Sequence, residues 1–332
     1  MTWVVWRQHR GQLFTGTAIL AVFAVLILIT GLQMASQYHS MMASCTASHD
    51  CDDFNFTLGN PVMTELVTLT TGVPAIMGLF WGAPLVAREL ETGTSQFMWM
   101  QSVTRRRWLT VKLAWILAAT AAWGGAIGGL VTWWAGPINA LNNGRFIRGQ
   151  FDVQGIVPIG YALFAVALGI AAGILLRRTL PALAATLAVF AAVRLGIANF
   201  VRAHYLPAVT TIYSYTGRGF TPAGSAWIFA NGTVGPNGVM YTPNSPGQLG
   251  QLEINGMGLN GLPASCNSLA SGAHPNFGRV LACAASHGYR GFFTYQPASR
   301  FWAFQGIETG IFVLLGAAVL RIAAFALLRR DA

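Results

Sequence analysis

The stretch that decides the fold is residues 82–112, GAPLVARELETGTSQFMWMQSVTRRRWLTVK. It holds acidic residues, a triple arginine and the only lysine of the chain, Lys112. Long apolar segments flank its polar centre on both sides: 62–86 and 108–134. A charged segment between two such runs predicts a membrane protein that exposes residues 87–107 as a polar loop on one side of the bilayer.

The composition supports a membrane protein. Of the 332 residues, 54% are hydrophobic and only 9% are charged, whereas soluble domains average about 25% charged residues. The net charge of +10 does not indicate nucleic-acid binding. The arginines gather at the ends of apolar runs, which is how membrane topology is marked and not how a phosphate backbone is followed.

Six segments reach the length of about 20 apolar residues that a spanning helix needs. They are 13–34, 62–86, 108–134, 156–176, 180–200 and 301–327. If the N-terminus is cytoplasmic, most basic residues outside the long last loop fall on the cytoplasmic side, as the positive-inside rule requires. These are Arg7, Arg10, Arg88, Arg105, Arg106, Arg107, Lys112, Arg177, Arg178, Arg329 and Arg330. We therefore predict an all-α polytopic protein with six transmembrane helices and both termini in the cytoplasm.

The spans divide the chain into four parts. Residues 1–12 pair tryptophans three apart with basic residues, which favours a short helix on the inner membrane surface; a plain aromatic and basic flank is the alternative. Residues 13–200 hold the first five spans, and 301–332 hold the sixth span and a cytoplasmic tail. Between them, residues 201–300 form a long outer loop rich in turn residues, for which we expect a small extracytoplasmic cap.

The four cysteines all fall in predicted outer loops, where disulfides persist. Three pairings are open. We favour the two local ones, Cys45–Cys51 and Cys266–Cys283, with free thiols as the alternative. No CxxC or paired-histidine spacing accompanies them, so the sequence predicts no metal site.

Two ionisable residues stand inside predicted spans, Arg194 in the fifth and Glu308 in the sixth. Each lies about two turns from the outer end of its span. A charge inside the membrane is costly and marks function by default. We expect the two side chains to pair and to line or close the outer end of a path. The alternative is that each reaches separately to the outer interface.

Small residues spaced four apart recur in the spans, and such pairs let helices approach closely. They include Gly124 with Gly128, Gly169 with Gly173, and Gly306 with Gly310. We interpret them as packing surfaces, within or between subunits, and not as a substrate site.

Several kinds of catalytic chemistry have no matching motif. A P-loop needs a glycine-rich turn that ends in lysine, and Lys112 stands in TVKL instead. The chain holds neither an HExxH zinc motif nor a GxSxG nucleophile elbow. We therefore predict that it is not an enzyme by itself and binds no cofactor.

Residues 87–112, ARELETGTSQFMWMQSVTRRRWLTVK, resemble the membrane subunits of ABC-2 type transporters. In that family the first inner loop carries an acidic E-x-E-x-G-T pattern, then a short S/T-R run, then a lysine that opens the third span. The matching positions are Glu89, Glu91, Gly93, Thr94, Thr104, Arg105 and Lys112. Two features depart from the pattern: the proline that many relatives have near Ser102 is missing, and the last outer loop is longer than in the simplest members.

The resemblance implies a type V exporter-like permease in a bacterial cell membrane. Such a subunit does not hydrolyse ATP. It dimerises with a second permease copy, here expected to be identical, and docks on two ATP-binding subunits that hold ATP and Mg. A coupling helix, expected over residues 84–91 and ended by Gly93, would contact the ATPase while the N-terminal helix braces it. The coupling residues would be Arg88, Glu89, Glu91, Gly93 and Thr94; alternatively, the glutamates only solvate a loop.

The sequence indicates the cargo only by composition. Spans dominated by alanine, leucine, valine and aromatic residues favour an amphipathic small molecule, such as a drug, an antibiotic or a lipid, exported from the cell. Two other functions stay open. One is a channel or an ion-coupled secondary transporter. The other is a membrane sensor or assembly protein that acts through its outer loop.

Overall fold

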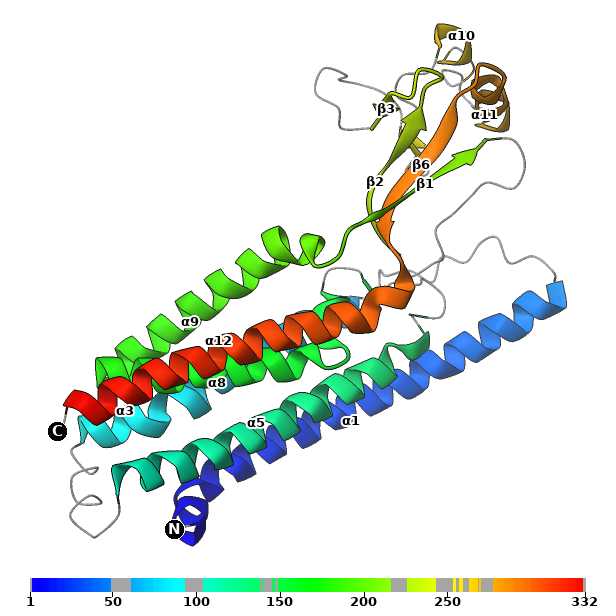
Figure 1. Ribbon diagram of the computed structural model, residues 1–332. Helices are drawn as coiled ribbons and strands as arrows, with labels where there is room; N and C mark the ends of the chain where they lie inside the picture. The colour runs from blue at the N-terminus through cyan, green and yellow to red at the C-terminus, as the bar shows by residue number, and fades with distance from the viewer. Residues whose placement is uncertain are drawn as a thin grey trace. The chain divides into compact units, whose positions relative to one another are not determined.

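The computed structural model (Figure 1) divides into two compact units. Unit 1 comprises Met1–Leu141, Ile147–Tyr205 and Trp302–Ala332, and unit 2 comprises Asn142–Phe146 and Leu206–Phe301. The structure describes residues 2–48, 61–92, 104–137, 139, 145–146, 149–215, 226–242, 253–254, 257–258, 263–267, 269 and 277–330.

Unit 1 is helical. Its elements are α1 (Thr2–Ser48), α2 (Pro61–Met77), the π-helical turn η1 (Gly78–Gly82), α3 (Ala83–Glu91), α5 (Arg105–Trp134), α7 (Gln150–Val153), α8 (Val157–Leu176), α9 (Thr179–Gly196), the π-helical turn η2 (Ile197–Val201), the 3₁₀ turn η3 (Arg202–His204) and α12 (Phe301–Arg330).

Among the described residues, six helices are long and apolar enough to cross a membrane, which confirms the predicted number of spans. Five of them agree closely with the predicted segments. The first overlaps the predicted segment 13–34 in its described part, Ala21–Ser44. Residues 2–12, for which the sequence predicts a separate interfacial helix, form the first turns of the continuous helix α1.

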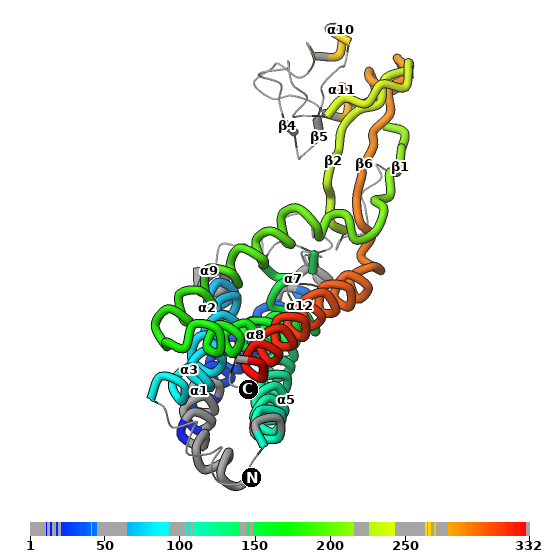
Figure 2. The backbone as a smooth tube through the Cα atoms, turned by 60° about the vertical axis from the view of Figure 1, so that its left-hand side comes forward, coloured from blue at the N-terminus to red at the C-terminus, as the bar shows by residue number. Residues whose placement is uncertain are grey.

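Helix α8 lies at the centre of unit 1 (Figure 2). It carries no charged residue, and nearly every residue from Val157 to Ile174 is buried. A helix that is apolar on all sides has to be covered on all sides. Here α2, η1, α3, α5 and α9 all pack against it.

Glycines bring α8 and the second span into close contact. A Cβ atom built on Gly78 would lie 2.6 Å from the Ala165 carbonyl oxygen, and one built on Gly82 would lie 2.6 Å from that of Val166. Gly169 and Gly173 face the same surface, which confirms the predicted packing role of that pair. Gly306 and Gly310 have open space around them within the chain.

The second span has no break before its charged end. Helix α2 continues through η1 into α3, so the coupling helix expected over 84–91 is instead the last two turns of the span. Thr92 caps it, because the Thr92 backbone N–H and hydroxyl both donate to the Arg88 carbonyl oxygen, at 3.0 and 2.8 Å. Continuous helical structure therefore joins this charged end to the buried centre of the bundle.

The close approach of α8 predicts a specific stability defect. Gly82→Ala should destabilise the purified chain by about 1–3 kcal/mol, because the new methyl group collides with the α8 backbone. Gly72→Ala is the matched control, since nothing lies within 4 Å of a Cβ atom at that position of the same span. Thermal unfolding in mild detergent measures both. Equal melting temperatures for the two variants would contradict the packing argument.

Unit 2 corrects the all-α prediction. Its strands β1 (Val209–Ser214), β6 (Arg290–Gln296), β2 (Trp227–Val234) and β3 (Met240–Tyr241) form an antiparallel sheet in that order. The short strands β4 (Glu253–Ile254) and β5 (Met257–Gly258) pair separately. The sheet forms because β1 and β6, VTTIYS and RGFFTYQ, are rich in β-branched and aromatic residues.

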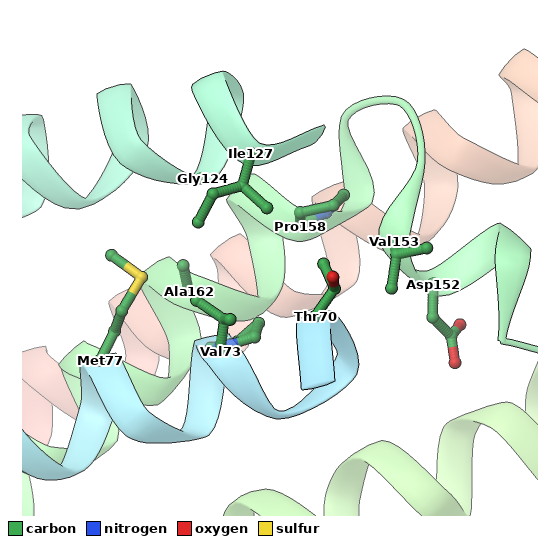
Figure 3. A pocket seen from close by; sticks show the side chains of 10 residues that line it. Thr70, Val73, Met77, Gly124, Ile127, Asp152, Val153, Pro158 and Ala162 are labelled. Carbon is green, nitrogen blue, oxygen red and sulfur yellow. The ribbon is translucent and has the colours of Figure 1, made fainter. Parts of the chain in front are cut away.

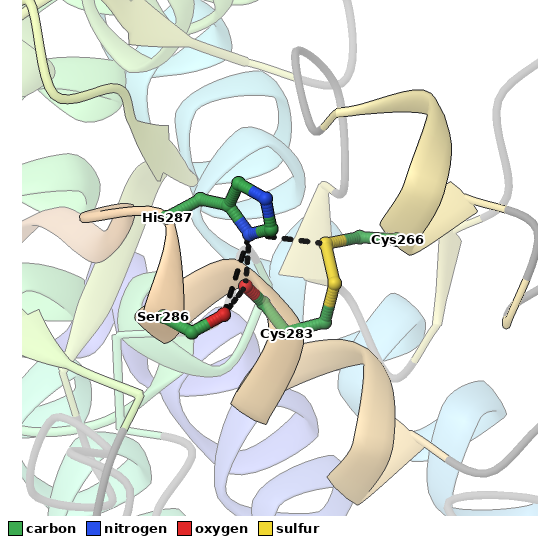
Figure 4. The surroundings of a disulfide bond; sticks show 4 residues. All are labelled: Cys266, Cys283, Ser286 and His287. Carbon is green, nitrogen blue, oxygen red and sulfur yellow. Dashed lines mark hydrogen bonds between the residues drawn. A yellow bond between two sulfur atoms is a disulfide. The ribbon is translucent and has the colours of Figure 1, made fainter.

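A disulfide bond joins the two short helices of unit 2 (Figure 4). Cys266 on α10 (Ala264–Asn267) is bonded to Cys283 on α11 (Phe277–Ser286), as predicted. His287 Nδ1 lies 3.9 Å from Cys266 Sγ, but both sulfur atoms are used in the disulfide, so these three residues are not a metal centre. The other predicted pairing involves Cys51, which lies outside the described residues. The 3₁₀ turn η4 (Ala298–Arg300) leads into α12.

Candidate functional site

Four charged side chains, three of them buried, form a network inside unit 1. Asp152 comes from α7, Arg194 from α9, Arg202 from η3 and Glu308 from α12. Glu308 is fully buried, and Arg202 is only 4% exposed. Buried charges of this kind are stable only when they are paired and hydrogen-bonded. We call these four residues the ionic network.

Arg202 and Glu308 make its strongest contact. The Arg202 guanidinium donates from Nε to Glu308 Oε2 at 2.7 Å and from Nη2 to Oε1 at 2.6 Å. Two parallel bonds of this type fix the relative orientation of the two groups. The Tyr161 and Tyr205 hydroxyls donate to the same carboxylate, at 2.5 and 3.2 Å. Burial, and then the nearby Glu308 carboxylate, raise the pKa of Tyr205, which keeps this hydroxyl protonated as a donor.

Asp152 links the two arginines. Its Oδ1 accepts from Arg202 Nη2 at 2.5 Å, and its Oδ2 lies 3.4 Å from Arg194 Nη2. Arg194 also donates from Nη1 to the Thr71 carbonyl oxygen at 2.5 Å, and its guanidinium lies 4.5 Å from the centre of the Tyr161 ring. Four charges of balanced sign therefore hold α7, α9, η3 and α12 together.

The network corrects the predicted direct pair of Arg194 and Glu308. Both residues belong to it, but Arg194 pairs with Asp152, and Glu308 pairs with Arg202. Sequence reasoning missed Asp152 and Arg202 because both fall just outside the predicted spans. One signal was present: Arg202 follows Arg194 by eight residues, so the two arginines lie about two turns apart on one side of a helix.

Gln305 holds the turn that presents Asp152. Its Oε1 accepts from the backbone N–H groups of Ile156 and Val157, at 3.0 and 2.9 Å, and its Nε2 donates to the Phe151 carbonyl oxygen at 3.0 Å. The side chain thus satisfies the first free N–H groups of α8, which a helix start otherwise leaves unpaired. Gly155 fits this turn because its φ is +67° and a Cβ atom would collide with Gln305.

A small pocket lies beside Asp152, between α2, α5 and α8 (Figure 3). Apart from Asp152, its wall is almost entirely apolar. The residues that form it are Thr70, Val73, Pro74, Met77, Gly124, Ile127, Val153, Pro158 and Ala162. The pocket has room for about one water molecule, and the Asp152 carboxylate points away from it (Figure 3). It is therefore a gap in apolar packing and not a binding cavity.

The opposite end of the bundle holds the acidic residues of the 82–112 stretch. Lys112 Nζ lies 2.5 Å from Glu89 Oε1, and the lysine side chain is only 1% exposed. Glu91 Oε2 accepts from the Thr179 backbone N–H at 3.0 Å and from its hydroxyl at 2.6 Å. The two carboxylates predicted to contact a partner protein thus contact their own chain.

Of the other three predicted coupling residues, the structure describes only Arg88. Arg88, on the last turn of α3, is exposed. Gly93 and Thr94 lie outside the described residues. Thr104, which matches the S/T of the family pattern, is the N-cap of α5 and accepts from the Arg107 N–H at 3.4 Å.

Comparison with known protein families gives a match. A family model described as "ABC-2 membrane transporter related" matches residues 17–202, which is more than half of the chain. The matched region contains the 82–112 stretch and three of the four residues of the ionic network. Neither the curated proteins nor the solved structures include a significant match.

Proposed function

Because the chain belongs to the ABC-2 membrane transporter related family, and is thus a multi-pass membrane permease, we propose that it is the transmembrane subunit of an ATP-binding cassette exporter. The observation that carries the proposal is the family match across the first five spans, including the charged stretch between the second and third. The cargo would be an amphipathic small molecule, such as a drug, an antibiotic or a lipid, moved out of the cell.

The nature of the buried groups supports an amphipathic cargo. The spans are apolar, and the ionic network balances two carboxylates with two arginines. A fully ionic substrate would favour additional buried polar groups along its path. A molecule with a large apolar part and a small polar part suits this interior better.

The family implies a partner that hydrolyses ATP. We propose two ATP-binding subunits, which bind ATP and Mg, and a second copy of this chain. The Glu91 end of the bundle would face the cytoplasm, with both termini, and unit 2 would lie outside the cell. The positive-inside rule supports this orientation, because exposed arginines gather at the Glu91 end: Arg88, Arg107, Arg177, Arg178 and Arg329.

We assign the docking contact to Arg88. It is exposed on the last turn of α3, and α3 is a direct continuation of the second span. A movement that the ATPase imposes on this turn would therefore reach the centre of the bundle through continuous helix, without an intervening loop. Charged contacts of this kind fix the register and specificity of an interface more than its raw affinity.

Charge reversal at Arg88 tests the proposal. We expect the tagged chain, purified from its native host in mild detergent, to carry a stoichiometric P-loop ATPase, and Arg88→Glu to lose about tenfold or more of it. Arg279→Glu, at an exposed arginine of unit 2, should retain it. Quantitative mass spectrometry of the eluates measures all three.

The outcomes separate two failures. If Arg88→Glu retains the ATPase, the family assignment stands and the docking contact is elsewhere. If the wild-type dimer purifies intact without any ATPase, the exporter proposal is wrong, and a channel, a secondary transporter or a sensor becomes the better explanation.

A further inference from the structure

We infer that Glu91 acts through Thr179 and not on the ATPase: this contact transmits movement of α3 to α9, and α9 transmits it to the ionic network at the other end of the bundle. The inference rests on the proposed function, because it concerns how a partner's movement would reach the outer side.

The first joint of this transmission connects two helix ends. Glu91 is the last residue of α3, and Thr179 is the first residue of α9. The carboxylate accepts both the backbone N–H and the hydroxyl proton of Thr179, which makes it the cap of α9. Negative charge at a helix start is favourable. Behind the cap, Ala83 of α3 and Ala182 of α9 are fully buried in one cluster, so the two helices also touch along their sides.

The second part is α9 itself. Helical structure continues from Thr179 through η2 and η3 to His204, a length of about 40 Å. Only one narrow row of its side chains is buried against the bundle: Ala182, Thr186, Phe190 and Arg194. This row packs on α8 and α3, and the other faces of α9 point away from the bundle. Its polar contacts with Glu91 and with the ionic network lie at its two ends, and Arg194 also donates to the Thr71 carbonyl oxygen of α2.

The second joint is the ionic network. Arg194 and Arg202 move with α9 and η3, whereas their partners Asp152 and Glu308 are held by α7 and α12. Gln305 fixes α12 to the turn that carries Asp152, so the two acids form one body. A displacement of α9 therefore changes the distance between the arginines and the acids. The ion pairs between the two arginines and the two acids would be formed in the resting state and broken when α9 moves.

The test uses the full permease–ATPase complex in lipid vesicles. Nitroxide labels on His204→Cys and Trp302→Cys, two exposed positions on either side of the network, report the distance between η3 and the start of α12. The unsubstituted chain is the labelling blank. In the wild-type background, trapping the ATPase with vanadate should change this distance by about one helical turn, or 5 Å.

Two variants then change the first joint. Glu91→Ala removes both hydrogen bonds and should abolish the distance change, whereas Thr179→Val keeps the backbone N–H bond and should only reduce it. In both variants the ATPase should stay bound and still hydrolyse ATP. Thr110→Val, at an exposed threonine at the same end of the bundle, should behave like the wild type.

Three results would overturn the inference. The first is an unchanged distance shift in Glu91→Ala. The second is loss of the ATPase from that variant, which would mean that Glu91 contacts the partner directly. The third is a wild-type complex that traps nucleotide without any shift. Absence of an ATPase from the wild-type chain is a different result, which contradicts the proposed function itself.

Discussion

Arg202→Met should cost the chain about 3–5 kcal/mol of unfolding free energy. The substitution leaves the fully buried Glu308 carboxylate without its cation, with only the Tyr161 and Tyr205 hydroxyls as donors. It also leaves Asp152 with Arg194, at 3.4 Å, as its cation and with the Tyr161 hydroxyl at 3.1 Å. Removing one member of a buried ion pair is expensive because the other member stays behind in a place where water cannot solvate it. Denaturant unfolding in mild detergent, followed by circular dichroism, measures the loss.

Two further variants make the prediction specific. Glu308→Met should cost less than Arg202→Met, because Arg202 keeps Asp152 as a partner at 2.5 Å. The double variant should be more stable than Arg202→Met alone, because it leaves Asp152 and Arg194 as a balanced pair. If the costs of the two single substitutions simply add, Arg202 and Glu308 do not interact in the folded protein, and the network as described is wrong.

The spans were predictable because each one needs a long apolar run. The predicted segment 156–176 and the observed Val157–Leu176 agree almost to the residue, because Arg177 and Arg178 end the run sharply. The first span lies within a longer helix, since α1 continues through polar residues on both sides of its apolar centre. Hydropathy locates the membrane-crossing part of a helix, but it does not say where the helix itself ends.

The sequence identified only part of the ionic network. Arg194 and Glu308 stand out because each interrupts an apolar run, but their partners do not. Asp152 is placed by a short helix and by Gln305, which lies 153 residues later in the chain. Pairings of this kind depend on tertiary packing, and no local pattern encodes them.

At the other end of the bundle, the charged stretch 82–112 also has contacts that its sequence could not predict. Its residue pattern correctly indicated the family. It could not show that Glu91 caps α9, because Thr179 is 88 residues away. The sheet of unit 2 was missed for a different reason. Its strands are short and stand among glycine- and asparagine-rich turns, which hide the alternation of VTTIYS and RGFFTYQ.

Lys112→Glu should be even more damaging than the loss of Arg202. The lysine side chain is 1% exposed and Glu89 is 17% exposed, and their contact joins α3 to α5 across the polar stretch. The substitution places two carboxylates about 3 Å apart in a site shielded from water, where like charges repel strongly. We expect a loss of more than about 3–5 kcal/mol, seen as failure to recover a monodisperse protein after extraction into mild detergent.

The charge swap Glu89→Lys/Lys112→Glu decides what Glu89 does. If Glu89 serves only to pair with Lys112, the swap restores the ion pair, and the doubly substituted chain should again be stable and should still bind its ATPase. If Glu89 is a docking residue, as its place in the family pattern suggests, the swap should restore stability but leave the ATPase unbound, because a lysine then faces the partner. We expect the first outcome, in which Glu89 only pairs with Lys112, because the Glu89 carboxylate accepts a hydrogen bond from Lys112 on α5. Recovery of stability and recovery of ATPase binding are separate measurements on the same preparation, so the structural role and the docking role of this residue can be told apart.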